Sequence, residues 1–398
     1  MATLLTGMVT MLVGCSGASS VAGKPADTTG NDFFSRGAEV LTWSQAQKEA
    51  YFARMDSIFP SHVAARGTVV HDLPAGAPLT TLTPTPAAQK ALTDFIASQR
   101  VAGLLIIQNG AIRLERYGLG QTPSSRWTSF SVAKSVTSTL VGAALKDGSI
   151  SSIDAPLTNY VGQLRGTAYD GVTVRQLLTM SSGVAWNESY TDPNSDLVRF
   201  TRYTPVAGLD ANITFASTLH REAAPGTKWV YKTIEANLLG TLVIAATGKP
   251  LATYLSEKIW SQYGMERDAT WLTDQIGHEQ GGAGVQATLR DYGRYGQLVL
   301  DGGVVNGQSI VPVGWFAAAT HKQFDTGVSG GGYGYQWWTY DTGSFEGRGI
   351  FGQLLYIDPS RKLVIVVLGA WNDAVGGSAA DQQRQLVAAI QSAVDAER

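Results

Sequence analysis

Two periods of hydrophobic spacing alternate along the chain and predict both helices and strands. Apolar residues recur at intervals of three and four, the spacing of one helix face, over residues 44–59, 84–98, 131–146, 289–300 and 381–396. Runs rich in aliphatic, β-branched and aromatic residues predict strands at 103–108, 111–117, 333–340, 350–357 and 363–368. Asn109-Gly110 separates the first two runs, and this dipeptide is typical of a tight hairpin.

The middle of the chain has a different pattern. Residues 150–264 are rich in turns and carry short helical patterns, as at 174–180, 233–247 and 251–260. Segments 32–149 and 265–398 hold the predicted strands and the longer helices. Helices at both ends of an antiparallel meander indicate an α+β fold. We therefore expect one lobe with an antiparallel sheet flanked by helices, and a second, mostly helical lobe formed by 150–264.

Composition and charge narrow the class of protein. The chain has 398 residues, of which 44% are hydrophobic and 16% charged, a globular composition with enough length for a large core and two lobes. The net charge is −2, and no run of Lys or Arg occurs. A nucleic-acid partner is therefore not expected, and the expected partner is a small molecule. The sequence does not determine the oligomeric state.

The single cysteine, Cys15, lies at the end of a short apolar segment. One cysteine excludes an internal disulfide and a cysteine-based metal site, and the apolar segment is too short to span a bilayer. Leu12-Val-Gly-Cys15 resembles a bacterial lipobox, which implies a signal peptide over 1–15, cleavage before Cys15 and lipidation of its sulfur. Residues 16–31 would be a flexible tether, and the protein would lie in the cell envelope, periplasmic or lipid-anchored. A buried N-terminal strand is the alternative.

Candidate chemistry starts at the predicted helix 131–146. Ser131 and Lys134 are three residues apart and share a helix face, so the ammonium can reach the hydroxyl. Backbone N–H groups and the positive end of the helix dipole lie beside a serine in this position, which suits a nucleophile that must carry an oxyanion nearby. On its own the pair is also compatible with an ordinary exposed helix start. A second element places Tyr231 just before the apolar helix 233–247.

These motifs together resemble the serine β-lactamase-like superfamily, with the class C β-lactamase and penicillin-binding-protein fold. Ser131-x-x-Lys134 matches its first motif, and Tyr231-Lys-Thr233 its Tyr-x-Asn motif with Thr in place of Asn. Gly347-Arg-Gly349-Ile350, before Asp358-Pro359, matches its Lys/His-x-Gly edge strand with Gly in the cationic position. Within the superfamily, the segments 186–193 and 349–353 are most similar to 6-aminohexanoate-dimer (nylon-oligomer) hydrolases and related esterases.

The resemblance implies a β-lactamase/transpeptidase-like fold and a serine hydrolase. Ser131 would form an acyl-enzyme, and either Lys134 or Tyr231 would act as the base, a choice that the sequence leaves open. Backbone N–H groups of Ser131 and Ile350 would hold the oxyanion. Substrate-binding residues would be Trp186, Tyr190, Thr233 and Gly349. No metal or cofactor is implied.

The expected substrate is a linear amide, such as an aminohexanoate oligomer, or a short-chain carboxylic ester. Gly347 cannot supply the cationic anchor, which disfavours a β-lactamase or D-amino-acid peptidase. A penicillin-binding or sensor protein that does not turn over is a further alternative. Gly327-Val-Ser329-Gly-Gly331 fits the nucleophile-elbow pattern, but no helix is predicted after it, so we interpret it as a loop. Ligand spacing is absent among the five histidines, His62, His71, His220, His278 and His321.

Overall fold

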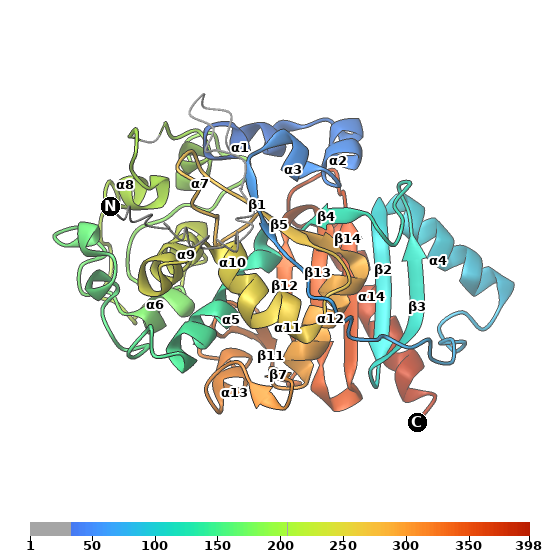
Figure 1. Ribbon diagram of the computed structural model, residues 1–398. Coiled ribbons are helices and arrows are strands. Elements are labelled where there is room, and N and C mark those ends of the chain that lie inside the picture. The colour runs from blue at the N-terminus through green and yellow to red at the C-terminus, as the bar shows by residue number, and fades with distance from the viewer. Residues whose placement is uncertain (1–32, 205) are drawn as a thin grey trace, which may run out of the picture.

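The computed structural model describes residues 33–204 and 206–398 (Figure 1). The predicted signal peptide, Cys15 and the tether lie outside the described residues. The centre of the molecule is an eight-stranded antiparallel sheet in the order β3-β2-β14-β13-β12-β11-β10-β9. Its strands are β2 (Val101–Gln108), β3 (Ala111–Tyr117), β9 (Phe324–Asp325), β10 (Gly331–Tyr333), β11 (Trp338–Tyr340), β12 (Phe345–Gly349), β13 (Gln353–Asp358) and β14 (Leu363–Gly369).

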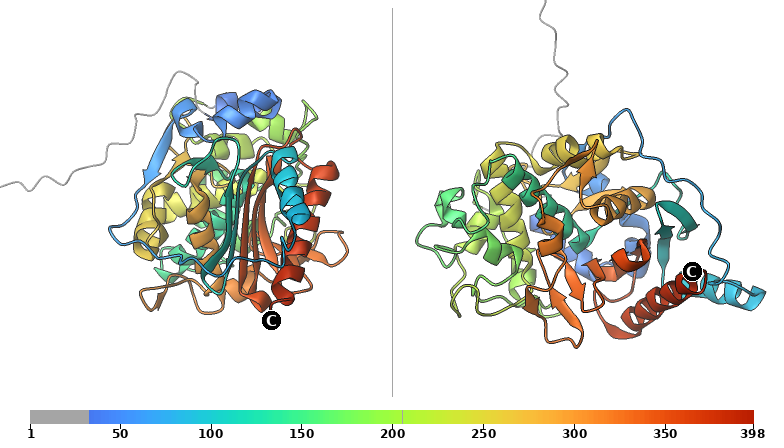
Figure 2. Two further views of the ribbon diagram at one scale, coloured as in Figure 1. Left: turned by 90° about the vertical axis from the view of Figure 1, so that its right-hand side faces the viewer. Right: turned by 90° about the horizontal axis from the view of Figure 1, so that it is seen from below.

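Helices cover both faces of this sheet. On one face lies α12 (Leu289–Leu300), and on the other lie α4 (Pro86–Ser98) and α14 (Gly377–Asp395) (Figure 2, left). Glycines allow the close approach of α12, because a Cβ atom at Gly296 would lie only 2.6 Å from Val364 Cγ1. On the opposite face, apolar residues of α14 form a core with alternate residues of the strands, including Leu386, Ile390, Leu104, Ile106 and Ile365.

A second, smaller sheet contains the strand that directly precedes Ser131 in the chain. Its four strands are β1 (Ser61–Ala64), β4 (Arg126–Thr128), β5 (Ala269–Leu272) and β6 (Val285–Thr288), in the order β1-β5-β6-β4. After β4 the chain turns through a 3₁₀ segment, η1 (Phe130–Val132), into α5 (Ala133–Lys146). Further elements outside the middle segment include α1 (Phe33–Thr42), α2 (Gln45–Tyr51), α3 (Met55–Ile58), α13 (Trp315–Ala319), β7 (Val304–Val305) and β8 (Gln308–Ser309).

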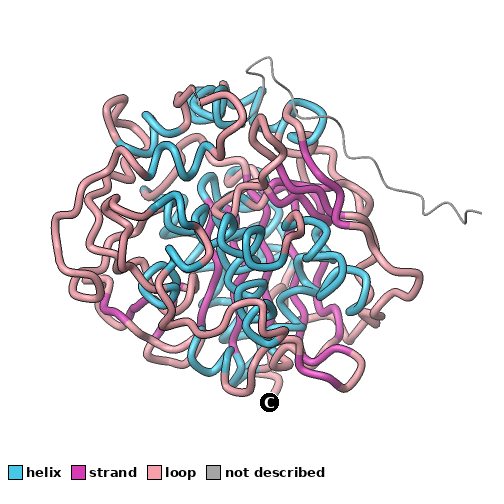
Figure 3. Tube along the Cα trace, turned by 60° about the vertical axis from the view of Figure 1, so that its left-hand side comes forward, coloured by secondary structure: helices cyan, strands magenta, loops and turns pink. Residues whose placement is uncertain are grey.

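Between residues 150 and 264, the elements that the structure describes are helical. They include α6 (Val174–Leu178), α7 (Asp196–Phe200), α8 (Ala211–Ala216), α9 (Thr233–Thr247), α10 (Leu251–Leu255) and α11 (Ser261–Tyr263). Helices α5 and α9 pack against each other and are almost entirely buried. Figure 3 shows the central helices in front of strands of the large sheet. No single helix of the described part is long and apolar enough to cross a bilayer, and the adjoining pair Thr233–Thr247 and Leu251–Tyr263 is bent by 77°.

The α+β fold and the β-lactamase-like architecture are confirmed, and the Asn109-Gly110 hairpin joins β2 to β3 with φ angles of 51° and 75° at its two turn residues. Four local predictions are wrong. The helix predicted over 44–59 is two helices, α2 and α3, because the chain turns after Tyr51 and buries Phe52 against Trp127 and Phe130. Strand β12 is interior rather than an edge, because β11, β10 and β9 extend the sheet beyond it.

The strand predicted over 333–340 is broken at Gln336, which has a φ of 64° and is 2% exposed. Its side-chain amide donates to the carbonyl oxygens of Leu177 (2.9 Å) and Leu178 (3.0 Å), so the break joins the sheet to α6. The strand predicted from Ile350 begins instead at Gln353. Residues Ile350–Gly352 form a 3₁₀ turn with φ angles of 61° at Phe351 and 94° at Gly352, backbone conformations that no strand contains.

Candidate active site

Ser131 lies in the turn that connects β4 to α5. Phe130 takes a left-handed φ of 43° and packs its ring against Phe52 and Phe351, with centroid distances of 5.0 and 5.4 Å. A non-glycine residue in this region is strained, and such strain is held by the packing around it. The turn places Ser131 on the wall of a cavity of about 700 Å³. Its hydroxyl is therefore accessible to a small molecule.

Lys134 is 1% exposed and directs its ammonium group at three oxygen atoms. Its Nζ lies 2.8 Å from Ser131 Oγ, 3.1 Å from Thr233 Oγ1 and 2.8 Å from the carbonyl oxygen of Gly282. Burial lowers the pKa of Lys134 to about 8, while the charge of Glu188 acts in the opposite direction. A substantial fraction of Lys134 is therefore neutral near pH 8, as a general base requires.

The carbonyl oxygen of Gly282 lies within hydrogen-bond distance of Lys134 because Gly281 and Gly282 let this segment pack directly on α9. A Cβ atom at Gly281 would be 2.3 Å from the carbonyl oxygen of Ala236, so the close approach excludes any side chain there. The N–H of Gly282 donates to Asn237 Oδ1 over 2.7 Å, and this bond aims the carbonyl of the same residue at Lys134. Sequence reasoning missed this contact. The Gly-Gly pair at 281–282 was its only local signal.

Tyr231 lies just before α9 and faces the same cavity. Its ring centroid is 5.2 Å from Lys134 Nζ and 5.4 Å from the ring of Trp338, on which it stacks. Burial and the charge of Glu188 raise the pKa of Tyr231, and the Ser131 hydroxyl and the charge of Arg348 only partly offset them. Tyr231 is therefore a protonated phenol at neutral pH.

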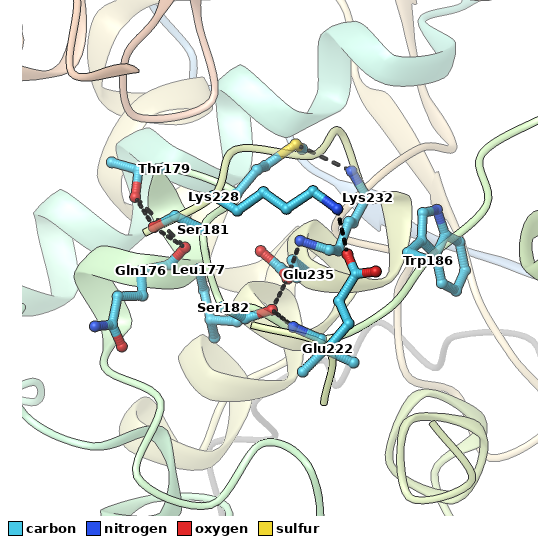
Figure 4. Close-up of polar contacts among 12 residues, drawn as sticks. Gln176, Leu177, Thr179, Ser181, Ser182, Trp186, Glu222, Lys228, Lys232 and Glu235 are labelled. Atoms are coloured by element: carbon cyan, nitrogen blue, oxygen red, sulfur yellow. Dashed lines mark hydrogen bonds and ion pairs between the residues drawn. The ribbon is translucent and has the colours of Figure 1, made fainter. Parts of the chain in front are cut away.

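Lys232, the residue after Tyr231, forms a buried ion pair (Figure 4). Lys232 Nζ lies 3.3 Å from Glu235 Oε1, with side chains 1% and 0% exposed. Ser182 donates its hydroxyl hydrogen to the same carboxylate oxygen, and the N–H of Lys232 lies 3.2 Å from Met180 Sδ. The segment 180–182 therefore fixes the backbone that presents Tyr231 to the cavity.

Glu188 lines the cavity beside Ser131 and Tyr231. It lies within the segment 186–193 that the sequence singled out, but only Trp186 and Tyr190 of that segment were predicted to act in the site. Its carboxylate accepts hydrogen bonds from the side chains of Trp186 and Tyr190 and from both the backbone N–H and the hydroxyl of Thr233. Of the predicted substrate-binding residues, Tyr190 and Gly349 line the main cavity. Thr233 is 9% exposed, lines a smaller cavity that also includes Ser131, and bonds Lys134 and Glu188. Trp186 is 8% exposed, and its ring packs against Phe215 rather than facing the cavity.

The end of β12 closes the other side of the cavity. Ile350 lines the wall beside Ser131, in the turn after β12. Gly349 must be glycine, because a Cβ atom there would lie 2.5 Å from the carbonyl oxygen of Ser129. Arg348 lines the cavity as well, forms an ion pair with Glu346 and lies over the Trp338 ring, 4.9 Å from its centroid.

One group of possible metal ligands occurs among the described residues. Ligand atoms of Asp210, Asp274 and His278 lie within 4.8 Å of one another. His278 Nδ1 is 2.8 Å from Asp210 Oδ2, and the other Asp210 oxygen caps α8. None of the three residues lines the cavity at Ser131, so this group is separate from the Ser131–Lys134 pair.

Comparisons with known proteins agree with this geometry. The model of the Beta-lactamase family matches residues 88–390. The 6-aminohexanoate-dimer hydrolase of Paenarthrobacter ureafaciens is 31% identical over 360 residues, which cover 83% of this chain and 88% of that protein. A solved structure from Bacillus anthracis, provisionally named a 6-aminohexanoate-dimer hydrolase, has a TM-score of 0.76 at 24% identity and covers 94% of this chain and 99% of its own.

A solved class C β-lactamase has a TM-score of 0.57 at 18% identity and covers 76% of this chain and 94% of its own, which shows a shared fold. The family match spans the candidate site from Ser131 to Ile350. The superfamily resemblance of the sequence motifs is thereby confirmed. This chain belongs to the Beta-lactamase family and is a serine β-lactamase-like hydrolase.

Proposed function

We propose that this hydrolase cleaves a linear amide or a short-chain carboxylic ester through an acyl-enzyme on Ser131. The observation that carries the proposal is the 2.8 Å contact between Lys134 Nζ and Ser131 Oγ on the wall of the cavity. A serine hydroxyl needs a base to become a nucleophile. Lys134, with its pKa lowered to about 8 by burial, is such a base at near-neutral pH.

In the first half-reaction, neutral Lys134 takes the Ser131 proton while Oγ bonds to the acyl carbon. The backbone N–H groups of Ser131 and Ile350 hold the resulting oxyanion. When the tetrahedral intermediate collapses, Tyr231 gives its phenol proton to the leaving amine or alcohol and regains one from the Lys134 ammonium. Deacylation repeats the sequence with water as the nucleophile. The raised pKa of Tyr231 supports its role as an acid and favours Lys134 over Tyr231 as the base.

The cavity lining supports a substrate with apolar groups beside the scissile bond. Aromatic side chains line much of its wall, namely Tyr190, Tyr231, Trp338, Tyr340, Tyr356 and Trp371. Two cationic side chains lie on the wall, and each is already in an ion pair: Arg348 with Glu346 and Arg384 with Asp381. The name of the Paenarthrobacter relative supports an aminohexanoate-type linear amide as the first substrate to test.

A β-lactamase or D-amino-acid peptidase remains the alternative reaction, and a binding protein without turnover the alternative role. Gly347 disfavours the first, because its missing side chain would point at Ser135 rather than into an open anchor site. A complete Ser131–Lys134–Tyr231 set disfavours the second.

The test compares p-nitrophenyl acyl esters, a linear aminohexanoate dimer and nitrocefin as substrates for the purified protein. Turnover is expected with the ester or the linear dimer and should vanish in Ser131→Ala. A fluorophosphonate should label Ser131, as read by peptide mass spectrometry. Ser329→Ala, which removes an exposed loop serine, is the matched control and should keep full activity. Labelling at Ser329, or hydrolysis of nitrocefin alone, would contradict the proposal.

A further inference from the structure

Glu188 can influence the orientation and the charge of the Lys134 amine without contacting it directly. Donors surround its carboxylate: the indole N–H of Trp186, the hydroxyl of Tyr190 at 3.1 Å, and the N–H of Thr233 at 2.9 Å together with the Thr233 hydroxyl. An ionised carboxylate only accepts hydrogen bonds. Each of these groups must therefore point its hydrogen at Glu188.

This requirement fixes the direction of the next hydrogen bond. The Thr233 hydroxyl has a single hydrogen, and Glu188 Oε1 accepts it. Thr233 Oγ1 can then interact with Lys134 Nζ, 3.1 Å away, only as an acceptor. The carbonyl oxygen of Gly282, 2.8 Å from Nζ, is also purely an acceptor.

These fixed acceptors determine how neutral Lys134 directs its hydrogens and its lone pair. A neutral amine has two hydrogens and one lone pair. Its hydrogens go to Thr233 Oγ1 and to the Gly282 carbonyl, because neither can donate to it. The lone pair is left for the third neighbour, Ser131 Oγ at 2.8 Å. The Ser131 hydroxyl is thereby oriented to donate its proton to Lys134.

We propose that Glu188, acting through Thr233, is a positioning residue that aims the lone pair of Lys134 at Ser131 and stabilises the ammonium that forms when the proton moves. This inference rests on the proposed acyl-enzyme function. The covalent step is unchanged: the Ser131 proton goes to Lys134, the Oγ–carbon bond forms, and Glu188 keeps its charge throughout. Glu188 thus orients the base much as a buried carboxylate orients the histidine of a catalytic triad.

The groups that face Lys134 and Tyr231 limit what else could set the pH dependence. Next to Lys134 are Tyr231, Thr233 and Glu188, and of these the Glu188 charge raises the pKa of the lysine. Around Tyr231 lie Tyr333, Trp338 and the charge of Arg348. Removing the Glu188 charge should therefore move the Lys134 titration to lower pH.

The experiment measures, across pH, the rate at which a fluorophosphonate acylates Ser131 and the kcat and KM for a p-nitrophenyl ester. In Glu188→Gln we expect a plateau rate about 10²-fold lower, at the low end of general acid–base effects. KM should stay within about 3-fold, because the Glu188 carboxylate, although it lines the cavity, already accepts hydrogen bonds from Trp186, Tyr190 and Thr233. The pH limb should shift to the acid side. Glu222→Gln, which removes an exposed carboxylate paired with Lys228, is the matched control and should behave as wild type.

A second pair of variants isolates the hydroxyl. Thr233→Val should reproduce the Glu188→Gln defect, Thr233→Ser should keep most of the wild-type rate, and the double variant Glu188→Gln/Thr233→Val should be little worse than either single change. These variants decide the question even if Glu188→Gln fails to fold. Equal rates in Thr233→Val and Thr233→Ser, or a slower Glu188→Gln whose pH limb has not moved, would overturn the inference and leave Ser131 acylation intact. Failure to acylate Ser131 in the wild type would instead refute the proposed function.

Discussion

Gly347 lies directly against Ser135: a Cβ atom at position 347 would be 3.0 Å from Ser135 Oγ and 3.3 Å from Val132 Cγ1. Ser135 cannot easily give way, because its hydroxyl donates to the carbonyl oxygen of Gln336 over 2.8 Å. The position at which the superfamily motif carries a cationic side chain is therefore packed against α5 in this protein.

This packing predicts that side chains at 347 are costly. Gly347→Ala should lower the free energy of unfolding by about 1–3 kcal/mol, the usual cost of overpacking, as measured by urea denaturation. Gly162→Ala is the control, because the nearest atom to its Cβ is 3.7 Å away, and its stability should be almost unchanged. A stable Gly347→Lys with nitrocefin hydrolysis would contradict the account of position 347.

The pH dependence of acylation should follow Lys134. Its folded-state pKa is lowered to about 8, and the neutral amine is the reactive form, so the acylation rate should rise with pH and level off above about 8. Lys134→Arg should lose activity about 10²–10⁴-fold, because a guanidinium cannot give up its charge. Lys146→Arg, an exposed lysine at the end of the same helix, is the control. A Lys134→Arg variant with near wild-type turnover would move the base to Tyr231.

Tyr231→Phe should separate substrates by their leaving groups. Burial raises the pKa of Tyr231, so its proton is available to the leaving group at neutral pH. An amine must be protonated to leave, whereas p-nitrophenolate leaves without a proton. We therefore expect a loss of about 10²–10⁴-fold on a linear amide and a clearly smaller loss of kcat on a p-nitrophenyl ester. Equal losses on both would show that Tyr231 acts before the leaving group departs.

The Lys232–Glu235 pair should behave as a buried ion pair beneath Tyr231. Lys232→Met alone leaves an uncompensated charge on Glu235 and should cost about 3–5 kcal/mol of stability, whereas Lys232→Met/Glu235→Leu should recover most of it. Urea denaturation of the three proteins measures this. The exposed pair Lys90–Asp94, with side chains 76% and 62% exposed, is the control, and Lys90→Met should change stability by less than about 1 kcal/mol. A double variant as unstable as the single one would refute the ion-pair explanation.

The lipid anchor at Cys15 stays a prediction, because it falls outside the described residues. In a bacterial host, Cys15→Ser should move the protein from the membrane fraction to the soluble fraction. Fractionation followed by immunoblotting measures the change, with Ser16→Ala as the matched control beside it. Equal membrane association of Cys15→Ser and the wild type would show that Cys15 is not an anchor.

Local spacing was enough to identify what lies on single elements. Ser131 and Lys134 share one helix face whatever the rest of the fold does, because residues three apart in a helix are neighbours. The Asn109-Gly110 hairpin also follows from local backbone preferences, since both turn residues need positive φ angles. Tyr231 was placed beside this pair only through the resemblance of its motif.

Tertiary structure decided the rest of the site. Glu188 and Gly282 come from loops far from Ser131 in sequence, and neither carries a periodic pattern, so only the packing of those loops against α9 brings them to Thr233 and Lys134. The turn at Ile350 was mistaken for strand because its apolar residues match a strand pattern, while left-handed φ angles at Phe351 and Gly352 break the strand there. Hydrophobic patterns record which residues are buried, but the direction of a hydrogen bond between distant side chains depends on coordinates that only the folded chain defines.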